Sequence, residues 1–301
     1  MQILFISSTR IGDAVLSTGL LAVLLERHPG ARITVACGPA AEGVFTRMPG
    51  LERLWLLRKR RWSAHWLGLW RHALVRRWDL VVDLRGSAMA WLVPARARAV
   101  MRGGRRPGHR LAHLAQVLGL APPPLPVAWW SAADAAALPP LPGRFLALGP
   151  TANWSHKVWP SERFVAVAVA LDLPVVVLGG PGAAEAAMAA PVLAALPGAQ
   201  NLVGQLSLPQ AAALLSRASL YVGNDSGLMH LAAAAGAPTL GLFGPTLADE
   251  YGPAGPRARA VLADPHESPD GASELDRLPR MDALPVARVL DAATAMLGVP
   301  A

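Results

Sequence analysis

The sequence has 301 residues, of which 53% are hydrophobic and 16% are charged. This length favours two domains rather than one, and the apolar content excludes a disordered chain. The net charge of +8 is uneven, because residues 1–140 hold 19 Lys or Arg against 7 Asp or Glu, whereas residues 141–301 hold 9 against 13.

The first half begins with an apolar run that predicts a strand over residues 3–8. No basic segment precedes it, and no run of about 18 uncharged apolar residues follows, so we expect a cytoplasmic protein. A helix over residues 14–27 and strands over 31–37, 51–57 and 79–84 follow. This alternation predicts a parallel sheet. The single cysteine, Cys37, excludes an internal disulfide, and its place at the end of a strand favours a buried thiol.

A polar loop, STRIGD, follows the first strand and offers Thr9, Arg10, Gly12 and Asp13. It lacks the GxGxxG pattern of dinucleotide-binding loops. Asp13 precedes the expected helix, which is compatible with a simple N-cap. It is also compatible with a general base, since a carboxylate suffices when the acceptor proton leaves late in the reaction.

Residues 55–78 combine tryptophan and arginine. Trp62, Trp66 and Trp70 recur every four residues and share one helical face, after the basic residues 58–61. The segment fits a helix on an anionic membrane surface, and it fits equally well a helix that packs its tryptophans on the sheet. A second basic stretch covers residues 96–110.

Residues 121–143 are rich in Pro and Ala and predict a linker. We therefore expect an acceptor-binding domain over residues 1–140 and a nucleotide-sugar-binding domain over residues 141–301. The second half repeats the strand and helix alternation, with strands over 144–149, 174–180, 220–224 and 238–244 and a final helix near 285–298.

The most informative stretch of the second half is a strand that ends at a polar loop followed by a helix of small residues. Asn224, Asp225, Ser226 and Gly227 form this loop. Backbone N–H groups at such a helix start attract phosphate, and glycine lets a ligand approach closely. The alternative is that Asn224 or Asp225 merely caps the helix. His230, one turn later, is either a ligand contact or a structural histidine.

Other candidates lie in loops at the same edge of the predicted sheet. Lys157 follows the first strand of the second half and is placed to neutralise a diphosphate, unless it is a solvated surface charge. Thr151 stands in the same loop and is a further donor-binding candidate. Glu185 follows the next strand, where it can accept a hydrogen bond from a ribose hydroxyl or lie exposed on a helix.

These motifs together resemble glycosyltransferase family 9, the lipopolysaccharide heptosyltransferases. The resemblance covers nearly the whole chain and is carried by residues 10–37, by residues 201–246, by KVWPSERF and by the late YGP. It implies a GT-B fold, an α/β architecture of two facing Rossmann-like domains with parallel sheets, whose last helix returns to the first domain. It also implies an inverting, metal-independent transfer from ADP-heptose to an inner-core acceptor.

The resemblance also implies residue roles. Asp13 matches the catalytic base and Lys157 the phosphate-contacting lysine, while Leu206 falls where the backbone of family members touches adenine. The donor-binding loop of the family matches Asp225, Ser226, Gly227 and His230, and Glu185 lies near the ribose contact. Many members carry cysteines between the YGP motif and the final helix, and this chain has none there, so its subgroup stays open.

We therefore expect a metal-independent glycosyltransferase without a cofactor, which takes a nucleotide sugar as donor and an anionic glycolipid as acceptor. Arg60, Arg61 and Arg105 would attract the acceptor's phosphates or carboxylates, and peripheral contact with the inner membrane is part of this expectation. The rivals are a nucleotide-sugar epimerase of the same fold and a non-catalytic nucleotide-binding protein. Nucleic acid is not expected as a partner, because no recognition module is visible.

Overall fold

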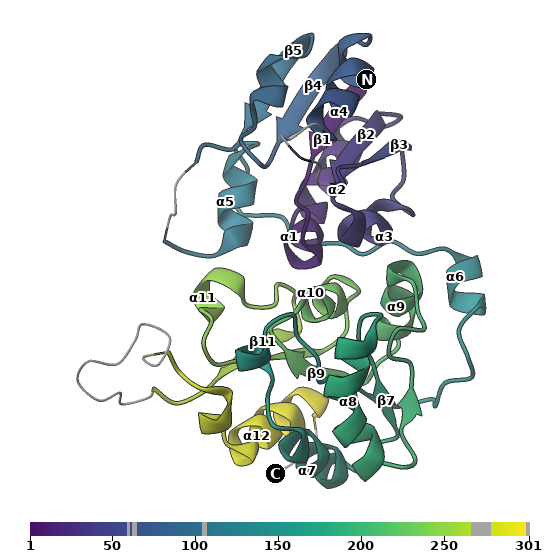
Figure 1. Ribbon diagram of the computed structural model, residues 1–301, viewed down its shortest axis with the longest axis vertical. Coiled ribbons are helices and arrows are strands. Elements are labelled where there is room, and N and C mark those ends of the chain that lie inside the picture. Colours follow the sequence, from purple (N-terminus) through teal and green to yellow (C-terminus); the bar gives the residue numbers. More distant parts are fainter. Residues whose placement is uncertain (59–60, 62–64, 104–106, 266–277, 299–301) are drawn as a thin grey trace. The chain divides into compact units, whose positions relative to one another are not determined.

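The computed structural model describes residues 1–58, 61, 65–103, 107–265 and 278–298 (Figure 1). The chain divides into two compact units, Met1–Ser131 and Ala132–Ala301. The division falls inside the Pro- and Ala-rich stretch, before residue 140, where we expected the boundary. Each unit holds its own parallel sheet.

In the described part of the first unit, five parallel strands form a sheet of order β3-β2-β1-β4-β5. The strands are β1 Gln2–Ile6, β2 Arg32–Cys37, β3 Leu51–Leu56, β4 Trp78–Asp83 and β5 Ala95–Val100. The helical segments are α1 Ile11–Leu16, α2 Thr18–Arg27, η1 Pro39–Ala41, α3 Glu42–Phe45, α4 His65–Leu74, η3 Ala88–Trp91 and α5 Arg110–Gln116.

Two elements of this unit differ from the expectation. The helix expected over residues 14–27 begins earlier and is divided at Ser17, whose Oγ donates to the carbonyl of Ala14 at 2.7 Å. Such local hydrogen bonds from serine compete with regular helix geometry. β5 was not expected, because the arginines of this short edge strand made residues 96–110 look like one basic stretch rather than an apolar strand.

One hydrophobic core cluster of the first unit forms where α4 packs on the sheet. Leu4 of β1 and Val81 of β4 are buried there with Leu69 and Ala73 of α4. Trp78 is fully buried, and its ring N–H donates to the Ala73 carbonyl at 2.9 Å, which joins the start of β4 to the end of α4. Apolar burial of this kind is the main stabilising contribution to the unit.

In the described part of the second unit, six parallel strands form a sheet of order β11-β10-β9-β6-β7-β8. The strands are β6 Leu146–Gly149, β7 Val175–Val177, β8 Gln200–Asn201, β9 Leu220–Asn224, β10 Thr239–Phe243 and β11 Ala258–Leu262. The helical segments are α6 Ala132–Ala136, η4 Ser155–Lys157, α7 Ser161–Leu171, α8 Ala183–Ala195, α9 Leu208–Leu215, α10 Gly227–Ala234, α11 Ala248–Tyr251, η5 Met281–Ala283 and α12 Val286–Leu297.

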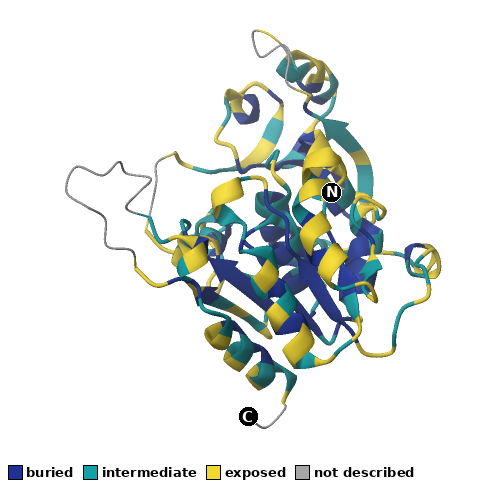
Figure 2. Cartoon of the chain, turned by 60° about the horizontal axis from the view of Figure 1, so that its bottom comes forward, coloured by how far each residue is buried: buried dark blue, intermediate teal, exposed yellow. Residues whose placement is uncertain are grey.

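The final helix belongs to the core of this unit. α12 contacts α7, β9 and β11, and its Val289 and Ala293 are fully buried. Figure 1 shows α12 beside α7. The apolar face of α12 is thus occupied within the second unit, and its expected return to the first domain stays a prediction. Figure 2 shows the central strands buried, while the helices that cover them carry exposed faces.

Parallel pairing decides where the polar loops emerge. β6, β7 and β9 run in the same direction, so the loops that follow them leave one edge of the sheet. Open α/β sheets bind ligands at this edge. Within the described residues, the structure has no helix of the length and apolarity that a membrane span requires.

Candidate functional site

The loop between β9 and α10 is built as the sequence suggested, but its helix is not capped by the expected residues. Ser226 is the N-cap residue of α10 and forms no side-chain capping bond. The Asn224 side chain instead accepts from the backbone N–H of Trp159 at 3.0 Å. Neither Asn224 nor Asp225 therefore serves as the cap, and the N–H groups at the helix start are not bound by a capping side chain. Such a helix start is suited to an anion.

Lys157 reaches this loop. Its ammonium lies 2.6 Å from Oδ2 of Asp225, and the hydroxyl of Thr246 donates to the same oxygen at 2.8 Å. The Lys157 side chain is only 18% exposed, so it is not a solvated surface charge. An ammonium has three donors, and one is used by Asp225. The remaining donors can bind an anion at the start of α10.

Glu185 and Thr151 meet at the loop after β7. The Glu185 carboxylate accepts from the backbone N–H of Gly180 at 3.0 Å, and a Cβ placed on Gly179 would lie 3.2 Å from the Thr151 methyl and 3.3 Å from Glu185 Oε2. Glu185 is therefore a half-buried residue that shapes the loop, rather than a freely exposed helix glutamate. Its second oxygen is left for a ligand hydroxyl.

Two further donor-binding candidates differ in exposure. Leu206 is half-buried in the bend before α9. The neighbouring Gly204 lies against the loop after β7, since its Cβ would be 3.2 Å from Pro181, and this places the bend near Glu185. His230 is buried within α10. The structure thus brings Lys157, Asp225 and the start of α10 together, and separately Thr151 and Glu185.

Tyr221 is a residue that the sequence analysis missed. It is fully buried in β9, and its hydroxyl occupies the space that a side chain at Gly149 or Gly223 would need. Burial raises the pKa of the Tyr221 phenol above its ordinary value, nearby Ser226 lowers it and Glu185 raises it further. The hydroxyl therefore lies beneath the polar loop. The signal in the sequence was a tyrosine within an apolar strand, two residues before Gly223.

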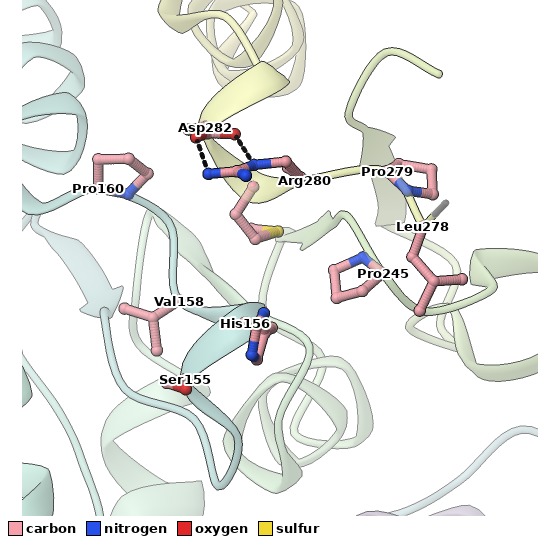
Figure 3. A pocket seen from close by; sticks show the side chains of 10 residues that line it. Ser155, His156, Val158, Pro160, Pro245, Leu278, Pro279, Arg280 and Asp282 are labelled. Carbon is pink, nitrogen blue, oxygen red and sulfur yellow. Dashed lines mark hydrogen bonds and ion pairs between the residues drawn. The ribbon is translucent and has the colours of Figure 1, made fainter. Parts of the chain in front are cut away.

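A hollow of about 190 Å³ lies beside the Lys157 turn (Figure 3). Ser155 and His156 line one side, Pro245 another, and Arg280 and Asp282 the rim. Arg280 pairs with Asp282 at 2.8 Å and lowers the pKa of that carboxyl. Sequence reasoning did not find the hollow, because its walls come from three distant segments.

Asp13 lies in the first unit, within the first turn of α1, and Arg10 is the N-cap residue. The simple N-cap interpretation of Asp13 is therefore wrong. Its Oδ1 lies 3.4 Å from Nε of Arg110, and the Ser8 hydroxyl lies 3.5 Å from Oδ2. The helix dipole favours a carboxylate in the first turn. The Arg110 guanidinium lies beside the Asp13 carboxylate, and both groups line one cavity.

A cavity of about 350 Å³ opens over Asp13. Its charged lining consists of Asp13, Arg85, Arg102 and Arg110, and its apolar lining includes Met101 and Leu114. Three guanidinium groups around one carboxylate leave an excess of positive charge, which suits an anionic ligand.

The fully buried carboxylate of Asp83 fixes the turn after β4 that lines one side of this cavity. It accepts from the backbone N–H groups of Arg85 and Ser87, both at 2.8 Å, and from the Ser87 hydroxyl at 2.6 Å. This fixes the turn that carries Arg85 at the end of β4. Arg85 could have been found from its place directly after a predicted strand, whereas Arg102 could not, because it follows β5, which was not expected.

Among the described residues, the other acceptor candidates do not line this cavity. Thr9 packs against Gly38, Gly12 is half-buried in α1, and Arg10 and Arg61 are exposed. Arg60, Arg105 and Trp62 lie outside the described residues. The arginines at the cavity are therefore ones that the sequence analysis did not single out.

Comparisons with known proteins identify the family of the chain. A family model described as "Glycosyltransferase family 9 (heptosyltransferase)" matches residues 115–281. Lipopolysaccharide heptosyltransferase 3 of Escherichia coli is 23% identical over 275 residues, which cover 78% of this chain and 81% of that protein.

Two solved structures show the same fold. The E. coli ADP-heptose lipopolysaccharide heptosyltransferase II has a TM-score of 0.73 at 24% identity, over 99% of this chain and 98% of the other. The E. coli heptosyltransferase WaaC with ADP has a TM-score of 0.77 at 18% identity, over 98% and 100%. At these identities the likeness establishes the fold, which is GT-B with two Rossmann-like domains.

Proposed function

The chain belongs to glycosyltransferase family 9 and is a glycosyltransferase, and from this premise we propose that it moves heptose from ADP-heptose to an anionic acceptor of the lipopolysaccharide-core type. The observation that carries the proposal is the Lys157–Asp225–Thr246 cluster at the uncapped start of α10. The relatives named above are heptosyltransferases, and one solved relative holds ADP.

The donor diphosphate is proposed to bind at the start of α10. Backbone N–H groups near Gly227 and the ammonium of Lys157 carry its charge. Glu185 and Thr151 would contact the ribose, and the backbone at Leu206 the adenine. Because these protein groups balance the charge on the leaving ADP, the proposal includes no metal and no cofactor.

Asp13 is proposed as the general base. Its carboxylate takes the proton of the acceptor hydroxyl, the hydroxyl oxygen forms a bond to the anomeric carbon, and the bond from that carbon to the diphosphate breaks. A single displacement of this kind inverts the anomeric configuration. Arg85, Arg102 and Arg110 would bind the acceptor's carboxylate or phosphate in the cavity beside Asp13.

A donor screen tests this proposal. Purified protein is mixed with ADP-heptose or other nucleotide sugars, with and without deacylated lipopolysaccharide-core acceptors, and released nucleotide is measured. We expect ADP release only when both substrates are present. Conversion of the donor without an acceptor would indicate an epimerase, and ADP binding without turnover on any acceptor would indicate a nucleotide-binding protein.

The acceptor class has a consequence for location. A glycolipid acceptor is held in a bilayer, so an enzyme that modifies it works at a membrane surface. We extend the proposal to peripheral contact of the protein with that membrane, on the cytoplasmic side where the nucleotide sugar is made.

A further inference from the structure

Large apolar side chains are exposed on one part of the first unit. Val75 is 80% exposed, Trp91 is 67% exposed and Leu92 is 58% exposed, and Leu67 and Leu74 of α4 are also exposed. These five residues come from α4, the turn that follows it and η3 with the residue after it. Soluble proteins rarely gather such side chains on one face without a partner.

The five residues form one surface, because α4 and the end of η3 are joined. The ring N–H of Trp70 donates to the Leu92 carbonyl at 3.1 Å. Trp70 lies one helical turn from Leu67 and one from Leu74, on the same side of α4. Beneath them, Leu69 and Met89 pack in the core of the unit, so the surface rests on a rigid support.

The orientation of α4 differs from one of the two sequence-based interpretations. Trp66 and Trp70 are half-buried against the core, and the Arg85 guanidinium lies 5.1 Å from the centre of the Trp66 ring. The described tryptophans of α4 therefore pack inward, and the exposed apolar contribution of the helix comes from its leucines. The exposed tryptophan of this face, Trp91, lies outside the segment that the sequence analysis considered.

Arginines border this apolar face. Arg71 and Arg77 are exposed at α4 and the turn after it, and the Arg98 guanidinium lies 5.8 Å from the centre of the Trp91 ring. Residues 65–98 contain six arginines and two aspartates. One aspartate, Asp79, lies 3.7 Å from Arg96, and the other is the buried Asp83. The border of the face is therefore positive.

We propose that this apolar–basic face, formed by Leu67, Leu74, Val75, Trp91 and Leu92 with Arg71, Arg77 and Arg98, docks the first unit on an anionic lipid bilayer. Apolar side chains enter the interface, and arginines meet the headgroup charge. A second copy of the chain is a poorer occupant, because a two-fold contact would bring these arginines against one another.

This inference rests on the proposed function, because docking on a bilayer serves the transfer only if the acceptor is anchored in that bilayer. Every residue of the face lies in Met1–Ser131, the unit that also holds Asp13 and the arginine-lined cavity. Docking through this unit would hold the acceptor-binding cavity at the membrane surface.

The test is co-sedimentation with vesicles. The whole protein is mixed with vesicles of neutral phosphatidylcholine, with or without one-third anionic phosphatidylglycerol, at low and at high salt. We expect binding to the anionic vesicles, little binding to the neutral ones, and loss of binding at high salt because the headgroup attraction is screened.

Two variants locate the surface. Trp91→Ser with Leu92→Ser should reduce binding by at least about tenfold, since the apolar insertion is lost. Arg71→Ser with Arg77→Ser should reduce it by about fivefold for each charge removed. Val169→Ser is the matched control, because Val169 is 66% exposed on α7 of the second unit; it should bind as the native protein does.

Three results would overturn the inference: no binding of the native protein to anionic vesicles, equal binding by the Trp91/Leu92 variant, or a concentration-dependent dimer that this variant abolishes. Turnover on a water-soluble deacylated acceptor separates the two proposals. Both surface variants should keep it, because none of the four residues lines the cavity. Vesicle binding without any transferase turnover would retain the docking surface and remove the proposed function.

Discussion

At the scale of single residues, Asp13 carries the proposed chemistry. It lies in the first turn of α1 beside Arg110 and at the edge of the arginine-lined cavity. The carboxylate is thus held by one cation and the helix dipole, while its open side faces the space where an acceptor hydroxyl would lie.

We predict that Asp13→Asn lowers turnover by about a hundredfold or more, because the amide cannot take the proton. Stability should fall by only about 0.3–1 kcal/mol, the contribution of a charge in a first helical turn. Steady-state ADP release and thermal unfolding measure the two effects. Unchanged ADP affinity by calorimetry is the control, and near-normal turnover would show that Asp13 has only a structural role.

Variants of Lys157 test whether its positive charge binds the diphosphate of the donor, because ADP carries that group and adenosine does not. Lys157→Ala should weaken ADP binding while adenosine binding hardly changes, because the lost partner is the diphosphate charge. Lys157→Arg keeps the charge and should recover part of the ADP affinity. Calorimetry with both ligands measures this difference. Equal losses for ADP and adenosine would mean that the alanine variant disturbs the loop through Asp225 instead.

At the scale of elements, Gly149 of β6 and Gly223 of β9 leave room for the ring of Tyr221. The Tyr221 hydroxyl fills the space above Gly149 and Gly223, beneath the loop that begins α10. A side chain at either glycine would displace the tyrosine ring or part the strands.

Gly223→Ala should therefore lower the free energy of unfolding by about 1–3 kcal/mol, as overpacked cores do. Adding Tyr221→Phe removes the hydroxyl and should restore part of that loss, which a double-mutant cycle from denaturant titrations would measure. Gly198→Ala is the matched control, since nothing lies within 4 Å of a Cβ there. Additive effects of the two substitutions would contradict this packing.

At the scale of the whole molecule, each unit has its own hydrophobic core. The single cysteine lies in the core of the first unit, so its reactivity measures unfolding of that unit alone. Cys37 is fully buried at the end of β2, and burial raises the pKa of its thiol to about 12. The reactive thiolate is therefore scarce at neutral pH, and a thiol reagent reaches Cys37 only when the first unit opens.

We predict that labelling of Cys37 in increasing denaturant follows unfolding of the first unit. Saturating ADP should raise the unfolding midpoint of the second unit, which holds the candidate donor site, by mass action. It should leave the labelling midpoint nearly unchanged. Far-UV circular dichroism, recorded beside the labelling, reports the loss of helix in both units and supplies the second signal, because only Trp154 and Trp159 of the ten tryptophans lie in the second unit. An equal shift of both midpoints would show that the two units unfold as one.

The strand and helix order could largely be predicted, because apolar runs separated by turn residues carry that information locally. The loop from Asn224 to Gly227 was also predicted, since a strand, a polar turn and a small-residue helix follow one another directly. β5 was missed, because its arginines gave it the composition of a basic surface segment rather than of a strand. The division at Ser17 was missed, because it coincides with a single side-chain hydrogen bond that the sequence pattern does not show.

The sequence by itself determined two parallel α/β units, a basic first half and the polar loop that precedes α10. Only the tertiary structure decided which side chains meet. Arg85 and Arg102 line the cavity over Asp13 because parallel pairing brings the ends of β4 and β5 to one edge of the sheet. Arg110, at the start of α5, contacts Asp13 itself. The exposed face of α4 was likewise decided by packing, because its tryptophans gain more from burial on the sheet than its leucines do.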